Sequence, residues 1–135
     1  MPLYLADTSA WNRSTATIER WEQLVAANEL ATCVPVELEL LISARSRTEY
    51  TALRGDLAFL PHLPLDARAA ELAASAQERL AGTSQHRGPK PIDLLIAAIA
   101  EAAGATLLHY DRHFDAIARV TGQPTEWLAR RGSLD

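Results

Sequence analysis

The sequence has very little cysteine and no long apolar run. Cys33 is the one cysteine among 135 residues, so no disulfide can form within the chain. No stretch approaches the ~18 consecutive apolar residues that a membrane span needs. The first residues also lack the basic start and small-residue cleavage site of a secretory signal. We therefore expect a cytoplasmic protein with no membrane segment.

Motifs of several enzyme classes are also missing. The four histidines never fall in a zinc-binding spacing with Cys33, no serine lies in a G-x-S-x-G context, and no Gly-rich loop could hold a phosphate. The net charge of −4 argues against binding nucleic acid through a broad basic surface. That count would mislead if several carboxylates surrounded a divalent cation, because the cation changes the local field.

Short apolar segments alternate with helical segments along the chain, which has the length of one domain, residues 1–135. We expect strands at 3–6, 30–34 and 105–110, and an edge strand or turn at 124–128. We expect helices at 15–25, 35–47, 49–60, 67–80, 92–103 and 114–120, with a long loop at 82–91. This alternation predicts an α/β fold whose mainly parallel sheet is covered on both faces.

Acidic residues follow two of the predicted strands or lie early in the helices near the same edge. Asp7 and Asp111 come at strand ends, where open parallel sheets place their ligand sites. Glu37, Glu39 and Asp93 lie early in helices near that edge. The two glutamates lie roughly 200° apart around a helix, so at most one can face a shared site, and periodicity does not choose between them. The alternative is that Asp7 and Asp111 form turns and Asp93 is a helix cap.

Carboxylates that converge repel one another unless a cation compensates. Mg²⁺ and Mn²⁺ prefer oxygen ligands and, with substrate phosphate, favour hydrolysis of phosphodiesters. Arg87 and Lys90, just before Asp93, are candidate contacts for RNA phosphates, or simply part of a flexible basic loop.

Four segments together resemble the VapC family of PIN-domain toxins, over nearly the whole chain. They are ADTSAW at 6–11, ELLISA at 39–44, PIDLLIAAIA at 91–100 and HYDRHFDAIA at 109–118. The resemblance implies a three-layer α/β/α fold and an endoribonuclease that cuts transfer or ribosomal RNA and so inhibits translation. It also implies a homodimer and a VapB-type antitoxin that neutralises the toxin.

The same resemblance implies which residues form the site. Asp7, Glu39, Asp93 and Asp111 correspond to the family's catalytic quartet, which binds Mg²⁺ or Mn²⁺. Thr8 and Ser9 correspond to the hydroxyl pair behind the first acid, with a supporting role.

The sequence departs from the family pattern in two places. Ser43 stands where the family often has Gly, and His113 stands where a second Asp is common, which leaves Asp115 as a weaker candidate ligand. The alternative function is a catalytically silent PIN-like module that binds RNA or protein. The complete quartet disfavours it, because a purely structural module has no reason to tolerate the repulsion.

Overall fold

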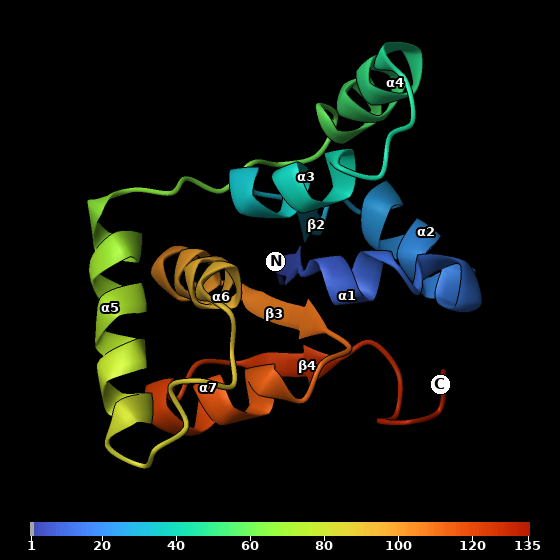
Figure 1. The fold of residues 1–135 in the computed structure, drawn as a ribbon. Helices are drawn as coiled ribbons and strands as arrows, with labels where there is room; N and C mark the ends of the chain where they lie inside the picture. The colour runs from blue at the N-terminus through green and yellow to red at the C-terminus, as the bar shows by residue number, and fades with distance from the viewer. Residues whose placement is uncertain (1) are drawn as a thin grey trace.

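The structure is a computed structural model that describes residues 2–135 (Figure 1). Its centre is a four-stranded sheet in the order β2-β1-β3-β4, and all three strand pairs are parallel. The strands are β1 (Tyr4–Ala6), β2 (Leu30–Ala31), β3 (Thr106–His109) and β4 (Thr125–Trp127). The predicted parallel sheet is therefore confirmed, and β4 is its edge strand.

Helices cover both faces of this sheet (Figure 1). They are α1 (Thr8–Trp11), α2 (Ile18–Ala26), α3 (Val34–Leu41), α4 (Arg47–Leu57), α5 (Ala67–Ala81), α6 (Pro91–Ala103) and α7 (His113–Thr121), with a 3-10 turn η1 (Ser14–Thr17). Successive strand residues point to opposite faces, so Leu5 packs with α5, α6 and α7, whereas Ala6 packs with α1 and α2. The three-layer α/β/α architecture is confirmed. Within residues 2–135, no helix has the length and apolarity to cross a membrane.

Local signals in the sequence fix several helix ends. Asp66 caps α5, since its side chain accepts a hydrogen bond from the Ala69 backbone N–H at 2.9 Å. Gly104 ends α6 in the left-handed conformation with φ of 69°, which glycine adopts without steric cost. The expected bounds of α5 and α6 therefore agree with the structure.

Three of the predicted element bounds were wrong. The strand expected at 30–34 is only two residues long, and the helix expected at 35–47 ends at Leu41. Ser46 accepts a hydrogen bond from the Glu49 backbone N–H and caps a new helix, so α3 and α4 are separate. The helix expected at 15–25 begins only at Ile18. Its apolar spacing predicts one shared face for Ile18, Trp21, Leu24 and Val25, but only Trp21 and Leu24 are buried.

Phe114→Ala is expected to lower the free energy of unfolding by about 3–5 kcal/mol, because it leaves a cavity in the core. Phe114 is completely buried on α7 and its ring lies 5.2 Å from that of His109. The matched control is Phe59→Ala, since Phe59 is 89% exposed. It should change stability by less than about 0.5 kcal/mol. Urea unfolding of both variants measures the difference, and equal losses would contradict the burial of Phe114 in the core.

Candidate active site

Asp7 lies at the carboxyl end of β1, where the chain leaves the sheet and enters α1. Its backbone N–H donates to the Leu108 carbonyl at 2.9 Å, which ties this turn to β3. The side chain is 4% exposed, and its Oδ2 accepts a hydrogen bond from the Ser9 backbone N–H at 2.9 Å. Its Oδ1 is buried and has no hydrogen-bond partner among residues 2–135. Asp7 is thus a helix cap that keeps one oxygen free.

Glu39 and Glu37 project from different sides of α3. Glu39 accepts a hydrogen bond from the Thr8 hydroxyl at 2.7 Å, which holds it beside the start of α1. Glu37 instead pairs with His62, whose Nε2 lies 2.8 Å from its Oε1. The choice that periodicity leaves open is therefore made by the surroundings of α3: Glu39 lies beside Asp7, and Glu37 does not.

Asp93 and Asp111 are also held by backbone groups at the starts of helices. Asp93 accepts a hydrogen bond from the Lys90 backbone N–H at 2.9 Å and is 9% exposed. Asp111 accepts one from the His113 backbone N–H at 2.9 Å and is half-buried. Asp93 therefore has the capping role considered as an alternative, but that role uses only one of its two oxygens.

The four carboxylates line one cavity of about 210 Å³ at the carboxyl ends of β1 and β3. Asp7 and Asp111 follow the ends of these strands. Glu39 comes from α3, and Asp93 comes from the first turn of α6. The full lining consists of Asp7, Thr8, Ser9, Asn12, Arg13, Glu39, Lys90, Asp93, Asp111 and His113. Four segments that are distant in the sequence thus bring their acids to a single hollow.

Burial and mutual repulsion disfavour the ionised acids in this cavity. Burial raises the pKa of Asp7 to about 6, and the charges of Asp93 and Glu39 add to that shift, against hydrogen bonds from Ser9 that lower it. Burial likewise raises the pKa of Asp93, and the charges of Asp111 and Glu39 act in the same direction. A cation in the cavity would remove this penalty.

The donor set fits a hard divalent cation that keeps part of its water shell. Each of the four carboxylates gives one oxygen to a protein hydrogen bond. The buried, unpartnered Oδ1 of Asp7 is an oxygen ligand without another use. Among the residues from 2 to 135, no group of three or more Asp, Glu, His or Cys side chains is arranged so that it could hold a metal ion by itself. Mg²⁺ suits such an open arrangement, because it takes one or two carboxylates together with waters and substrate oxygens.

The hydroxyls and two further side chains support the acids. The Ser9 hydroxyl accepts a hydrogen bond from the Tyr110 backbone N–H at 2.9 Å and so joins α1 to the end of β3. Arg13 donates to the Ser9 carbonyl at 3.2 Å and lies 4.5 Å over the Tyr110 ring. Sequence reasoning did not identify Asn12 or Arg13, although they follow Asp7 by only five and six residues.

The remaining candidates are placed differently from the quartet. Lys90 lines the cavity, whereas Arg87 does not. Asp115 is also absent from its lining, and its Oδ1 accepts a hydrogen bond from the Trp127 indole N–H at 3.1 Å. His113, which occupies the place of a second family Asp, lines the cavity. Burial raises the pKa of Asp93, and the charge of His113 opposes that rise only in part.

Comparison with known proteins adds to this geometry. The family model for the PIN domain matches residues 4–120. Ribonuclease VapC18 of Mycobacterium tuberculosis is 40% identical over 136 residues, covering 98% of this chain and 99% of the relative. Ribonuclease VapC51 of the same species is 41% identical over 134 residues, covering 98% and 97%. A crystal structure of DNA-bound VapBC from Salmonella typhimurium matches with a TM-score of 0.75 and 20% identity, over 96% of this chain and 100% of that one.

Proposed function

Because the chain belongs to the PIN domain family, we propose that it is a VapC-type endoribonuclease toxin of a toxin–antitoxin pair. The observation that carries this proposal is the meeting of Asp7, Glu39, Asp93 and Asp111 at one cavity. Two relatives that are about 40% identical over nearly the full chain are named ribonucleases, which supports the same activity. The proposed substrate is transfer or ribosomal RNA, whose cleavage would inhibit translation.

We propose Mg²⁺ or Mn²⁺ as the cofactor, held by Asp7, Glu39, Asp93 and Asp111. When bound, such an ion activates water and stabilises charge on a phosphate group. The protein's own contribution is positional. The Thr8 hydroxyl donates a hydrogen bond to Glu39 Oε1 at 2.7 Å. The backbone N–H of Ser9 holds one oxygen of Asp7, and that of Lys90 holds one oxygen of Asp93. These contacts orient the carboxylates before substrate arrives, so little reorganisation is needed.

A VapB-type antitoxin is the proposed protein partner, and the protein is proposed to act as a homodimer in the cytoplasm. Val34, Leu38 and Ile42 lie four residues apart on one face of α3 and are 55%, 56% and 83% exposed. A row of large exposed apolar side chains is typical of a surface that another protein covers. The solved VapBC structures that share this fold are consistent with such a partner.

The proposal is tested with purified protein, freed of any partner, and a single-stranded RNA. We expect cleavage with Mg²⁺ or Mn²⁺ and none with EDTA. Glu39→Gln should lower the rate by more than about a hundredfold, since even residues that only support a metal ligand are worth 10–100-fold. Gel analysis of 5′-labelled RNA measures both effects.

The matched control is Glu37→Gln, which makes the same change on the same helix but at a side chain that pairs with His62 and does not line the acidic cavity. It should keep the rate within about twofold of the unmodified protein. RNA that stays intact with metal and folded protein would overturn the enzyme proposal. Binding of that RNA without cleavage would favour the silent module instead.

A further inference from the structure

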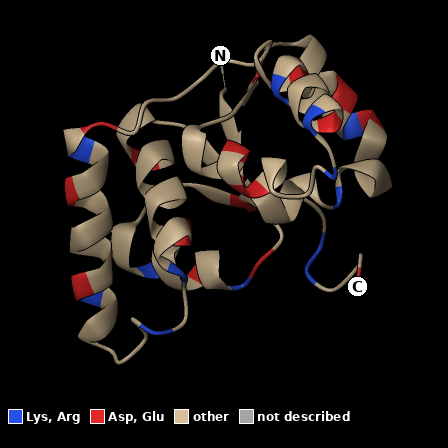
Figure 2. Cartoon of the chain, turned by 45° about the horizontal axis from the view of Figure 1, so that its top comes forward, with Lys and Arg blue, Asp and Glu red and all other residues tan. Residues whose placement is uncertain are grey.

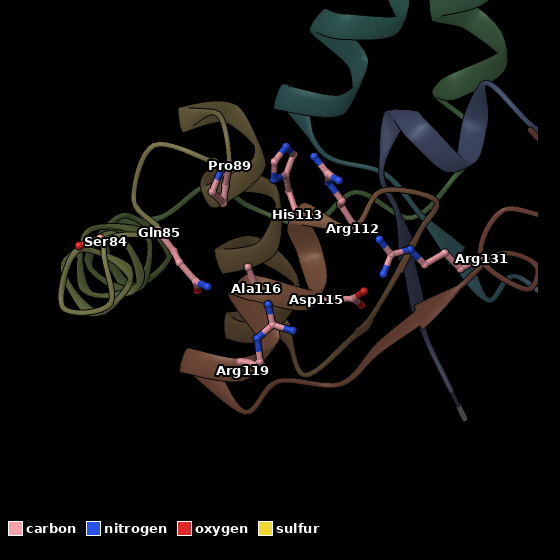
Figure 3. Close-up of a pocket in the computed structure, with 10 residues that line it drawn as sticks. Ser84, Gln85, Pro89, Arg112, His113, Asp115, Ala116, Arg119 and Arg131 are labelled. Carbon is pink, nitrogen blue, oxygen red and sulfur yellow. The ribbon is translucent and has the colours of Figure 1, made fainter.

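A second cavity, of about 360 Å³, lies between α7, the loop before α6 and the C-terminal tail (Figure 3). Arg112, Arg119 and Arg131 line it, and Arg119 and Arg131 lie on either side of Asp115. Arg112 lies beside His113 at the N-terminal end of α7. Three arginines therefore line one hollow in a chain whose net charge is −4.

These three arginines have no acidic partner within residues 2–135. Among the described residues, none of the three side chains forms an ion pair or donates a hydrogen bond, in contrast to Arg20, which pairs with Glu126. Asp115, the one acid in the lining, gives an oxygen to the indole of Trp127. Asp115 supplies one negative charge against three positive ones, so the arginines still repel one another, and a ligand with several anionic oxygens would offset this repulsion.

A third cavity, of about 410 Å³, connects this cavity to the acidic one. Arg112 and Arg131 line both the 360 Å³ cavity and the connecting cavity. Arg13 and Asp111 line both the connecting cavity and the acidic cavity. Figure 2 shows basic residues on the C-terminal tail along this side of the molecule. The three cavities therefore adjoin one another and form one path from the quartet, past the C-terminal tail, to α7.

We propose that this path binds the backbone of a single-stranded RNA segment on one side of the cleavage site, with phosphates on Arg112, Arg119 and Arg131. This inference rests on the proposed function, and it names arginines other than Arg87 for the RNA contact. Guanidinium groups bind phosphate through paired N–H donors, so three of them along a path suit successive phosphates. The path runs through three separate cavities, which a flexible single strand can follow more readily than a rigid duplex.

The test compares two double variants that each remove two positive charges. Arg119→Gln/Arg131→Gln changes the path, and Arg47→Gln/Arg54→Gln changes α4 as the control. Affinity for a fluorescent single-stranded RNA is measured with EDTA present, so that no cleavage occurs. The path variant should bind about tenfold more weakly at about 0.1 M salt, because charge-assisted contacts to phosphate are lost. The slope of log K against log salt should fall by about 1.4, since each single-strand phosphate contact contributes about 0.7.

The control variant should keep both the affinity and the salt slope of the unmodified protein. Equal losses in both variants would mean a general charge effect and would overturn the inference. An unchanged path variant would also overturn it, even if the unmodified protein cleaves RNA. The proposed function fails separately, when the unmodified protein does not cleave RNA with Mn²⁺. If the path variant binds RNA normally but no longer binds the antitoxin, the path belongs to the protein partner and the inference is overturned.

Discussion

Asp7→Asn is expected to lower RNA cleavage by more than about a hundredfold and, without a cation, to make the protein more stable. The buried carboxylate has a pKa of about 6 against an ordinary 3.8, so its ionisation is disfavoured in the folded chain. The folded protein is therefore most stable when Asp7 is protonated, and its free energy of unfolding falls as the pH rises from about 3.8 through about 6. The ionised group at pH 7.5 costs up to about 3 kcal/mol relative to the acid form.

Asparagine keeps the oxygen that accepts from the Ser9 backbone N–H and removes the charge. Its amide can also donate toward the neighbouring acids, where Asp7 has an unpartnered oxygen. Urea unfolding in EDTA at pH 7.5 should show a gain of up to about 3 kcal/mol that shrinks at pH 5, where Asp7 is protonated. Cleavage with Mn²⁺ should fall by more than about a hundredfold.

The control for this stability gain is Asp56→Asn, which removes a charge from the exposed face of α4. It should leave both stability and cleavage unchanged within error. A loss of stability for Asp7→Asn in EDTA at pH 7.5 would show that the carboxylate is needed for folding, and the inferred cost of its burial and of repulsion by Asp93 and Glu39 would then be wrong.

Much of the fold could be predicted because its signals are local. Asp66 caps a helix through its own side chain, and Gly104 ends one through its own backbone conformation. Predictions failed where distant contacts decide the outcome. The expected strand continues through residues 32–34, but Thr32 pairs with His62 in an isolated bridge and helix α3 starts at Val34. The spacing of apolar residues does not show whether this segment continues the strand or begins the helix.

The site shows the same division between local and distant information. The ends of parallel strands meet at one edge, so Asp7 and Asp111 could be placed together from the sequence. The choice of Glu39 depends on Thr8, which lies 31 residues away, and on the pairing of Glu37 with His62. Neither contact has a signal in the spacing of the residues. The resemblance to a known family supplied that choice, and the geometry of α3 gives its physical reason.

Affinity for Mn²⁺ is expected to fall steeply below about pH 6. Binding requires the ionised acid, and burial together with the neighbouring charges raises the pKa of Asp7 to about 6. Below that value a proton competes with the cation, so the affinity should fall about tenfold for each pH unit. The pKa of Asp93 is also raised, mainly by burial, which makes the fall steeper at lower pH. Ordinary carboxylates would give a flat profile between about pH 5 and 7.5, because they stay ionised throughout.

Isothermal titration calorimetry with Mn²⁺ measures this dependence without any cleavage reaction. The proton that leaves Asp7 is taken up by the buffer, so the heat of binding at about pH 6 should depend on the ionisation heat of the buffer. At about pH 8 that dependence should vanish, because Asp7 is already ionised. Glu37→Gln should reproduce the profile of the unmodified protein, since Glu37 faces His62. A constant affinity from pH 7.5 to 5 would mean that the cation does not displace a proton from the quartet, and the assignment of Asp7 as a ligand would be lost.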